Sequence, residues 1–139
     1  MSVIELKNLA DETTDIKKAF NQIQTYKQQI PSLFTFNTFC VISDGIEAQL
    51  GTISADFDRF MSWKSVDGKT ISSPARLFES LVYGVYTPER FVDLVTNFIV
   101  FEKDRDDIIK KIAAYHQYFA VEKAINTTLE AVHKQTNKC

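Results

Sequence analysis

Glu5 and Lys7 stand two residues apart in the segment SVIELKN near the start of the chain. The segment is rich in β-branched and aliphatic residues, which predicts a strand over residues 3–7. Residues two apart on a strand project to the same face, so this carboxylate and this ammonium would lie side by side. Such a pair suits metal-dependent phosphodiester hydrolysis. The carboxylate would hold a hard cation such as Mg²⁺, and the lysine would orient water or stabilise charge on phosphate.

The alternative interpretation of Glu5 and Lys7 is an ordinary surface ion pair, which contributes little to stability. A second pair of polar residues, Gln22 and Tyr26, is spaced four apart in AFNQIQTYK. On a helix these two side chains share a face beside the apolar stripe that contains Phe20. They would flank a site at the end of the strand with an amide and a phenol, or else form an amphipathic rim without a special role.

The composition bounds the class of protein. The 139 residues suffice for a compact core, and a net charge of −2 with a pI near 5.7 gives no global basic field for DNA. The cysteines, Cys40 and Cys139, are far apart, so we expect no structural disulfide. No apolar run approaches the roughly 18 residues of a membrane span. We therefore expect a cytoplasmic protein without a membrane partner.

The first half of the chain reads as strand, helix and hairpin. A helix is predicted from Asp15 to Ile30, ended by Pro31, with an apolar stripe that includes Ile16, Ala19, Phe20, Ile23 and Ile30. A strand is expected over 38–43, and Asp44-Gly45 predicts a two-residue hairpin turn before a strand over 46–53. Residues 56–69 read as an irregular surface segment that ends in a second Asp-Gly turn.

The second half reads as helical. One helix is expected from Ser73 to residue 85, and a second begins after Thr87 as N-cap and continues to Phe98. Residues 102–107 read as a solvated linker or as the acidic N-terminal flank of a helix. A last helix is predicted over 108–134, with a break near Tyr115 as an option. The fold class is thus α/β in its first half and helical in its second, with a boundary near residue 68.

Five segments together resemble one family. VIELKN, AFNQIQTYKQQIPSLF, VISDG, RFMSW and IIKKIAAYHQYFAVEKAI occur in the order found in the restriction (R) subunit of type I restriction–modification enzymes. The resemblance covers essentially the whole chain. It implies a partial PD-(D/E)xK nuclease core (strand, helix, β-hairpin) followed by a helical segment that leads to an ATPase motor.

The resemblance also implies roles for particular residues. Glu5 and Lys7 match the Glu-x-Lys of the nuclease motif, with Glu5 as the Mg²⁺ ligand, and Gln22 and Tyr26 match a Gln-x-x-x-Tyr signature that assists DNA engagement. In YHQ, Gln117 matches a glutamine that reads adenine, with Tyr115 packed nearby. The implied partners are double-stranded DNA and the modification and specificity subunits, with ATP used by the intact subunit.

The chain departs from the family pattern in two respects. The metal-binding Asp expected upstream of Glu5 is absent, and the ATP-binding loop expected beyond the last helix does not occur. We therefore expect an internal fragment, with residues 1–68 as the end of a nuclease domain and 69–139 as a helical connector. The isolated chain is expected to be inactive and to self-associate through an exposed N-terminal strand.

An alternative function belongs to a different class. The chain would then be a non-catalytic interaction or connector module, or a catalytically dead nuclease remnant. The aromatic-rich run from Phe78 to Phe101 is the feature that bears on this reading. Exposure of those rings as a contiguous patch would favour an interface, whereas burial would make them core.

Overall fold

The computed structural model describes residues 1–7 and 15–136, so Asn8 and Cys139 lie outside the described residues. The elements mix helices with strands, which confirms the α/β class. Three short 3₁₀ helices, Pro31–Phe34, Phe57–Arg59 and Pro74–Arg76, accompany them. In chain order the main elements are β1 (Val3–Leu6), α1 (Ile16–Gln29), β2 (Cys40–Ser43), β3 (Ala48–Gly51), α2 (Leu77–Val85), α3 (Pro88–Asn97), β4 (Ile99–Asp104), β5 (Asp107–Ile112) and α4 (Tyr115–Thr136).

The first three strands form one sheet in the order β1-β2-β3. β1 runs parallel to β2, with Val3 beside Cys40, and α1 makes the crossover that a parallel pair requires. β2 and β3 form the predicted hairpin, but Ser43 pairs with Ala48, so the loop has four residues rather than two. The Asp44 carboxylate holds this longer loop because it accepts hydrogen bonds from the backbone N–H groups of Ile46 and Glu47.

Helix α1 begins and ends where the sequence predicts. Asp15 is its N-cap, and the Asp15 carboxylate accepts a hydrogen bond from the Lys17 N–H at 3.0 Å. Pro31 follows the C-cap and prevents the helix from continuing. The predicted stripe is buried at Ile16, Ala19 and Ile23, but Ile30 is 49% exposed, because the helix has ended there.

The sheet separates two clusters of buried side chains. On one face Cys40 and Ile42 of β2 pack with α1 and with Phe34 and Phe60. On the other face Val41 and Leu50 pack with Trp63 and with residues from α2 and α3. The strand alternation of β2 therefore buries side chains on both faces.

The segment over 56–69 is not the surface loop predicted from its composition. Trp63 is 1% exposed, Phe60 is buried, and Ser65 is fully buried. The Met61 backbone exchanges two hydrogen bonds with Leu50, which attaches this segment to the edge of β3. Because polar residues lie between the aromatic ones in this segment, its composition did not indicate that the rings are buried.

The structure overturns the predicted linker and the start of the last helix. Residues 99–112 form the antiparallel hairpin β4–β5, and α4 begins only at Tyr115. Ile99, Val100 and Phe101 favour a strand, and Ile108, Ile109 and Ile112 fit strand spacing as well as helix spacing. The tight turn contains Arg105 at φ 55, a backbone conformation that the sequence does not signal.

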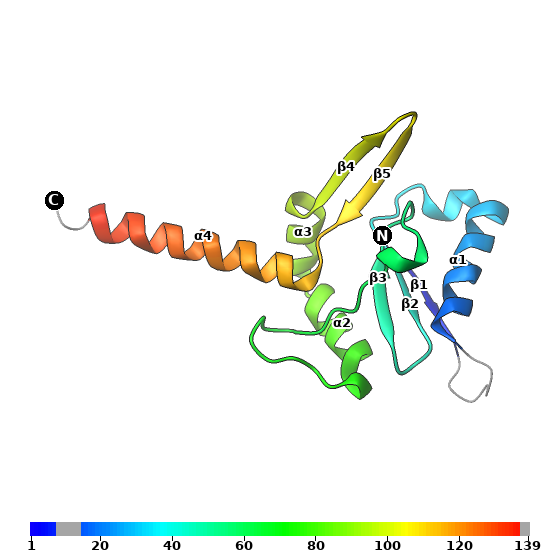
Figure 1. The fold of residues 1–139 in the computed structure, drawn as a ribbon, viewed down its shortest axis with the longest axis horizontal. Helices are drawn as coiled ribbons and strands as arrows, with labels where there is room; N and C mark the ends of the chain where they lie inside the picture. The colour runs from blue at the N-terminus through cyan, green and yellow to red at the C-terminus, as the bar shows by residue number, and fades with distance from the viewer. Residues whose placement is uncertain (8–14, 137–139) are drawn as a thin grey trace.

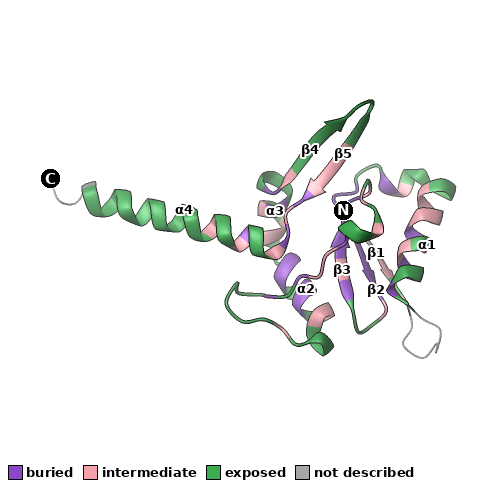
Figure 2. Cartoon of the chain, viewed as in Figure 1, coloured by how far each residue is buried: buried purple, intermediate pink, exposed green. Residues whose placement is uncertain are grey.

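Helices α2 and α3 confirm the predicted helices, with Thr87 at the N-cap position of α3. Leu81, Val85, Leu94 and Phe98 join the same buried cluster as Phe39 and Trp63, so one cluster spans residue 68. The β4–β5 hairpin and α4 extend away from this body (Figure 1). The distal part of α4 is exposed on all sides, whereas its first turns are partly buried (Figure 2).

Candidate functional site

Glu5 and Lys7 lie together on one face of the first strand, as the sequence predicts. The Lys7 Nζ is 2.8 Å from the Glu5 Oε1. The Lys7 side chain is 27% exposed and the Glu5 side chain is 14% exposed. Lys7 follows β1, but its backbone N–H donates to the Ser43 carbonyl at 2.9 Å, so the parallel ladder continues to it. The ion pair is therefore built on regular strand geometry and is partly exposed to solvent.

The face that carries this pair is the one covered by α1. Val3 alternates with Ile4 and Leu6 along β1, and Val3 packs against the cluster that contains Ile16, Ala19 and Ile23. Glu5 and Lys7 share the parity of Val3, so they lie at the end of this packed face. Ile4 and Leu6 project from the opposite face, where they are 45% and 56% exposed.

The outer edge of β1 has no partner strand in the described sheet. Val3 donates to the Phe39 carbonyl and Lys7 to the Ser43 carbonyl, which directs the odd-numbered backbone groups toward β2. In a parallel ladder the intervening residues, Ile4 and Leu6, then direct their N–H and C=O groups away from β2. Those groups can accept another strand beside the Glu5–Lys7 pair.

Gln22 and Tyr26 both lie on α1, one helical turn apart, and both are half-buried. Tyr26 packs against the buried cluster beneath α1, the same cluster that contacts Val3 of β1. The predicted shared face is therefore observed, and it belongs to the helix that covers the Glu5 side of the sheet. Gln22 lies one turn before Tyr26 and is open enough to reach solvent.

Tyr115 and Gln117 lie elsewhere, at the start of α4 (Figure 1). The Tyr115 ring contacts the buried Trp63 ring edge-on, with centroids 6.5 Å apart. The Gln117 Oε1 accepts a hydrogen bond from the Ala114 N–H at 2.9 Å, which caps the first turn of the helix. The exposed Gln117 also borders a groove of about 640 Å³ that runs along the β4–β5 hairpin.

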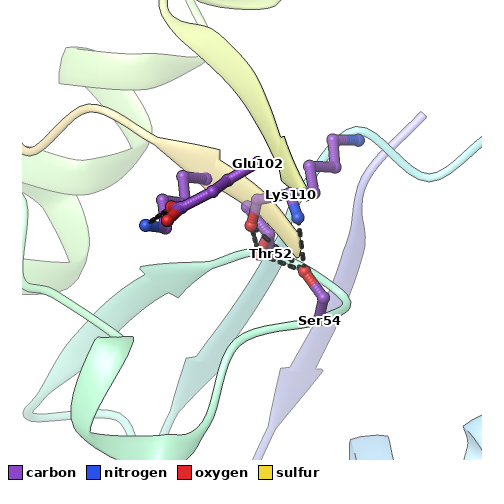
Figure 3. A network of polar contacts seen from close by, with 5 residues as sticks. Thr52, Ser54, Glu102 and Lys110 are labelled. Atoms are coloured by element: carbon purple, nitrogen blue, oxygen red, sulfur yellow. Dashed lines mark hydrogen bonds and ion pairs between the residues drawn. The ribbon is translucent and has the colours of Figure 1, made fainter. Parts of the chain in front are cut away.

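Sequence reasoning missed the polar network that forms one wall of this groove. The hydroxyls of Thr52 and Ser54 donate to the Lys110 carbonyl at 2.5 and 3.1 Å, and the Lys110 N–H donates to the Ser54 Oγ at 2.8 Å (Figure 3). The next residue of β5, Lys111, forms an ion pair with Glu102 across the hairpin. The only sequence signal is a pair of hydroxyl residues two apart after β3, which is too common to be read alone.

The Lys110 side chain contributes to the same attachment. Its Nζ donates to the Asn37 carbonyl at 2.8 Å, and burial lowers the pKa of this ammonium. Backbone and side chain of Lys110 thus hold β5 against the loops that precede β2 and follow β3. The base of the hairpin is fixed by these bonds, while its tip at 104–107 is exposed.

The described residues do not by themselves form a complete metal site, because no group of three or more His, Cys, Asp and Glu side chains is placed to hold an ion. Glu5 offers one hard oxygen ligand on a side chain that is 14% exposed, and a cation held there would need its remaining ligands from elsewhere. Cys40 is not a candidate ligand, since burial raises its thiol pKa to about 11.

Within 1–7 and 15–136, no helix is both long and apolar enough to cross a membrane.

Comparison with protein families identifies the class. Residues 1–59, which contain β1, α1 and the β2–β3 hairpin, match the family model of the type I restriction enzyme R protein N terminus. The match begins with the strand that carries Glu5 and Lys7 and extends past Gln22 and Tyr26. The chain belongs to the R subunit family of the type I restriction enzymes.

Particular relatives extend the match to the rest of the chain. The type I restriction enzyme HindI endonuclease subunit of Haemophilus influenzae is 46% identical over 142 aligned residues, which cover 98% of this chain. A protein of Methanocaldococcus jannaschii, provisionally named the type I restriction enzyme MjaIXP endonuclease subunit, is 28% identical over 95% of this chain. The chain spans only 13% and 14% of the lengths of these two relatives. No solved structure matches the chain.

Proposed function

We propose that this segment contributes Glu5 and Lys7 to the metal-dependent cleavage of double-stranded DNA by an intact type I R subunit. The observation that carries the proposal is the 2.8 Å contact between Glu5 and Lys7 on a solvent-accessible strand face. Glu5 would hold Mg²⁺, and the bound ion would polarise the scissile phosphate and activate water. Lys7 would orient that water and stabilise the negative charge that develops on phosphate.

The free edge of β1 supports the same proposal. A metal site of this chemistry needs a second carboxylate, and a strand added beside Ile4 and Leu6 would bring its side chains next to Glu5. We propose that the intact subunit supplies this carboxylate from outside residues 1–139. The isolated chain is accordingly inactive, and its open edge allows self-association through β1 at high concentration.

Gln22 and Tyr26 are proposed to support DNA engagement from α1. Their side chains lie on the helix that covers the Glu5 side of the sheet, and both are half-buried. An amide and a phenol at this position can donate hydrogen bonds to phosphate oxygens. Loss of either side chain would weaken cleavage without removing the ion pair of Glu5 and Lys7.

Tyr115 and Gln117 are proposed to serve ATP binding in the intact cytoplasmic subunit, where Gln117 would read the adenine edge. Its exposure beside the groove supports this role, and its amide nitrogen can donate while its oxygen caps α4. We further propose residues 1–68 as nuclease and 69–139 as connector to the motor. The modification and specificity subunits would contact the assembled enzyme.

The test uses the HindI endonuclease subunit in which this chain replaces its matching segment. Plasmid cleavage and ATP hydrolysis are measured with the other subunits, Mg²⁺ and ATP present. Lys7→Ala is expected to reduce cleavage by about two orders of magnitude or more while ATP hydrolysis continues. Lys69→Ala, in an exposed turn, is the matched control. Unchanged cleavage by Lys7→Ala would refute the proposal.

A connector function is favoured by a different observation. One buried cluster joins Phe39 and Trp63 to Leu81, Leu94 and Tyr118, so the helices are packed rigidly onto the sheet. Most aromatic rings of the run from Phe78 to Phe101 lie in or against this cluster, so they are core and do not favour an interface, whereas Tyr83 and Phe101 are exposed. The helices can therefore fix the orientation of one domain relative to another without any catalytic role. Full cleavage activity in a Glu5→Gln variant of the chimera would support this alternative.

A further inference from the structure

Helix α4 divides into an anchored start and a distal part that touches little. Tyr118 is 5% exposed and belongs to the buried cluster around Trp63. The Arg90 guanidinium lies over the rings of Tyr118 and Phe119, with its carbon 5.5 and 5.1 Å from their centroids. These contacts fix the first two turns of α4 to α3 and to the sheet.

Beyond these turns the helix is exposed on every side. All residues over 123–135 are exposed, and the helix leaves the body of the molecule as a single rod (Figures 1 and 2). A helix of 22 residues is about 33 Å long. An isolated helix as short as the exposed part over 123–135 is marginal in water, because most helix stability comes from packing an apolar face.

The exposed part nevertheless carries an apolar stripe. Val121, Ile125, Leu129 and Val132 are 43%, 48%, 52% and 53% exposed. Their spacing of four, four and three residues places all of them on one side of the helix. Four polar residues occupy the opposite side: Lys123, Asn126, Glu130 and Lys134. This is the pattern of a helix with one buried face, yet Val121, Ile125 and Leu129 are each more than 40% exposed.

The spacing of the stripe bears on what covers it. Val121 and Val132 are eleven residues apart over three turns, about 3.67 residues per turn, which does not give the left-handed supercoil of a two-stranded coiled coil. A seven-residue repeat from Val121 would place Thr128 in the seam and leave Leu129 beside it. The stripe suits packing against the surface of a globular domain better than against a second copy of α4.

The relatives contain much more polypeptide than this chain, and that polypeptide can supply such a surface. The family model for the R protein N terminus matches residues 1–59, ahead of α4, and the HindI subunit is covered over 13% of its length. We propose that the stripe Val121–Ile125–Leu129–Val132 packs against an apolar surface of the R subunit polypeptide that lies beyond α4 in these longer relatives. This inference rests on family membership and is independent of whether Glu5 and Lys7 cleave DNA.

The test compares backbone hydrogen exchange over residues 123–135 in the free chain and in the HindI chimera. The exposed rod exchanges rapidly in the free chain, and docking in the chimera slows these amides by about tenfold or more. Ile125→Glu combined with Leu129→Glu abolishes the slowing. The control, Asn126→Glu with Thr127→Glu, adds the same charge on the polar side and keeps the slowing. All four positions are exposed, and circular dichroism of the free chain verifies that each variant folds.

Two results would overturn the proposal. Equal exchange of 123–135 in the free chain and the chimera would mean that the stripe is not covered in the subunit. Protection that appears in the free chain and rises with its concentration would identify a second copy as the occupant. DNA cleavage is not read in this experiment, so a failed nuclease proposal leaves its outcome unchanged.

Discussion

The hydroxyl of Ser2, directly before β1, shares a hydrogen bond with the phenol of Tyr86 at the end of α2, with their oxygens 2.8 Å apart. The two residues are 84 positions apart in the chain, and the Tyr86 ring is stacked on Phe91 and meets Phe39 edge-on. This bond attaches the strand of the candidate site to the helices that follow residue 68. Burial raises the pKa of the Tyr86 phenol, which keeps it protonated and able to donate.

We expect Tyr86→Phe to lower the free energy of unfolding by about 1 kcal/mol, because the ring contacts stay and one partly buried hydrogen bond is lost. Urea denaturation of the isolated chain measures the change. Tyr83→Phe, whose side chain is 58% exposed, is the control and should alter stability by less than about 0.5 kcal/mol. Equal effects of the two substitutions would show that the Ser2–Tyr86 bond does not hold the strand.

Gly84 is required by the close approach of α2 to Trp63. A Cβ at residue 84 would lie 2.3 Å from the Trp63 Nε1 and 3.1 Å from the Ser65 carbonyl oxygen. An alanine ordinarily favours a helix, but here the buried indole would have to move. We expect Gly84→Ala to destabilise the chain by about 2 kcal/mol, as overpacking of a core does.

Thermal unfolding of Gly84→Ala measures this effect. The control is Lys123→Ala on the exposed part of α4, which should change stability by less than about 0.5 kcal/mol. A Gly84→Ala chain as stable as the parent would mean that the indole of Trp63 has free space beside it.

Asp67 organises the turn over 65–70. Hydrogen bonds from the backbone N–H groups of Thr70 and Lys69 lower the pKa of its carboxyl from 3.8 to about 2. A carboxyl whose pKa is lowered on folding stabilises the folded state above the ordinary pKa, and this contribution is lost as the pH falls through about 2.

A carboxyl titration by nuclear magnetic resonance should therefore give Asp67 a midpoint near 2, below the ordinary value of 3.8. Asp67→Asn should flatten the acid side of the stability profile between about pH 4 and 2 relative to the parent. An ordinary midpoint for Asp67 would mean that the turn does not hold its carboxylate in solution.

Cys40 should be unreactive toward thiol reagents in the folded chain. Its side chain is fully buried, and burial raises its pKa from 9.0 to about 11, so the thiolate is scarce at neutral pH. In a Cys139→Ser variant, a disulfide reagent at pH 8 should label Cys40 only as fast as the chain opens, and completely in denaturant. Rapid labelling without denaturant would contradict the burial of β2.

The raised pKa of Cys40 also predicts the direction in which the free energy of unfolding changes at alkaline pH. Below about pH 9 both folded and unfolded states keep the thiol proton, and stability does not depend on it. Between about 9 and 11 the unfolded thiol ionises while the folded one does not, so the contribution of Cys40 falls as the pH rises.

Local chemistry is what made parts of this fold predictable. Asp15 as a cap and Pro31 as a stop fix both ends of α1, and Asp44-Gly45 marks the first hairpin. Glu5 and Lys7 needed only the two-residue period of a strand to be placed together. Each of these signals lies within a few residues of the element that it determines.

The missed elements depend on partners far along the chain or on an unusual backbone conformation. Trp63 is buried because α2 and α4 pack over it, which no pattern within 56–69 reveals. The β4–β5 hairpin needs a positive φ at Arg105 and is held by Thr52 and Ser54, more than 50 residues earlier. The spacing of Ile108, Ile109 and Ile112 suits a helix equally well, so tertiary contacts decide the outcome.

Trp63, the single tryptophan of the chain, has a practical consequence as an optical reporter. Its buried ring is in contact with the rings of Tyr115, Tyr118 and Phe119 at the start of α4, so its fluorescence reports one defined junction. Lifting α4 from the sheet would bring water to the indole and shift its emission to longer wavelengths. The coupling between the sheet and the projecting helix can therefore be followed in real time without attaching a dye.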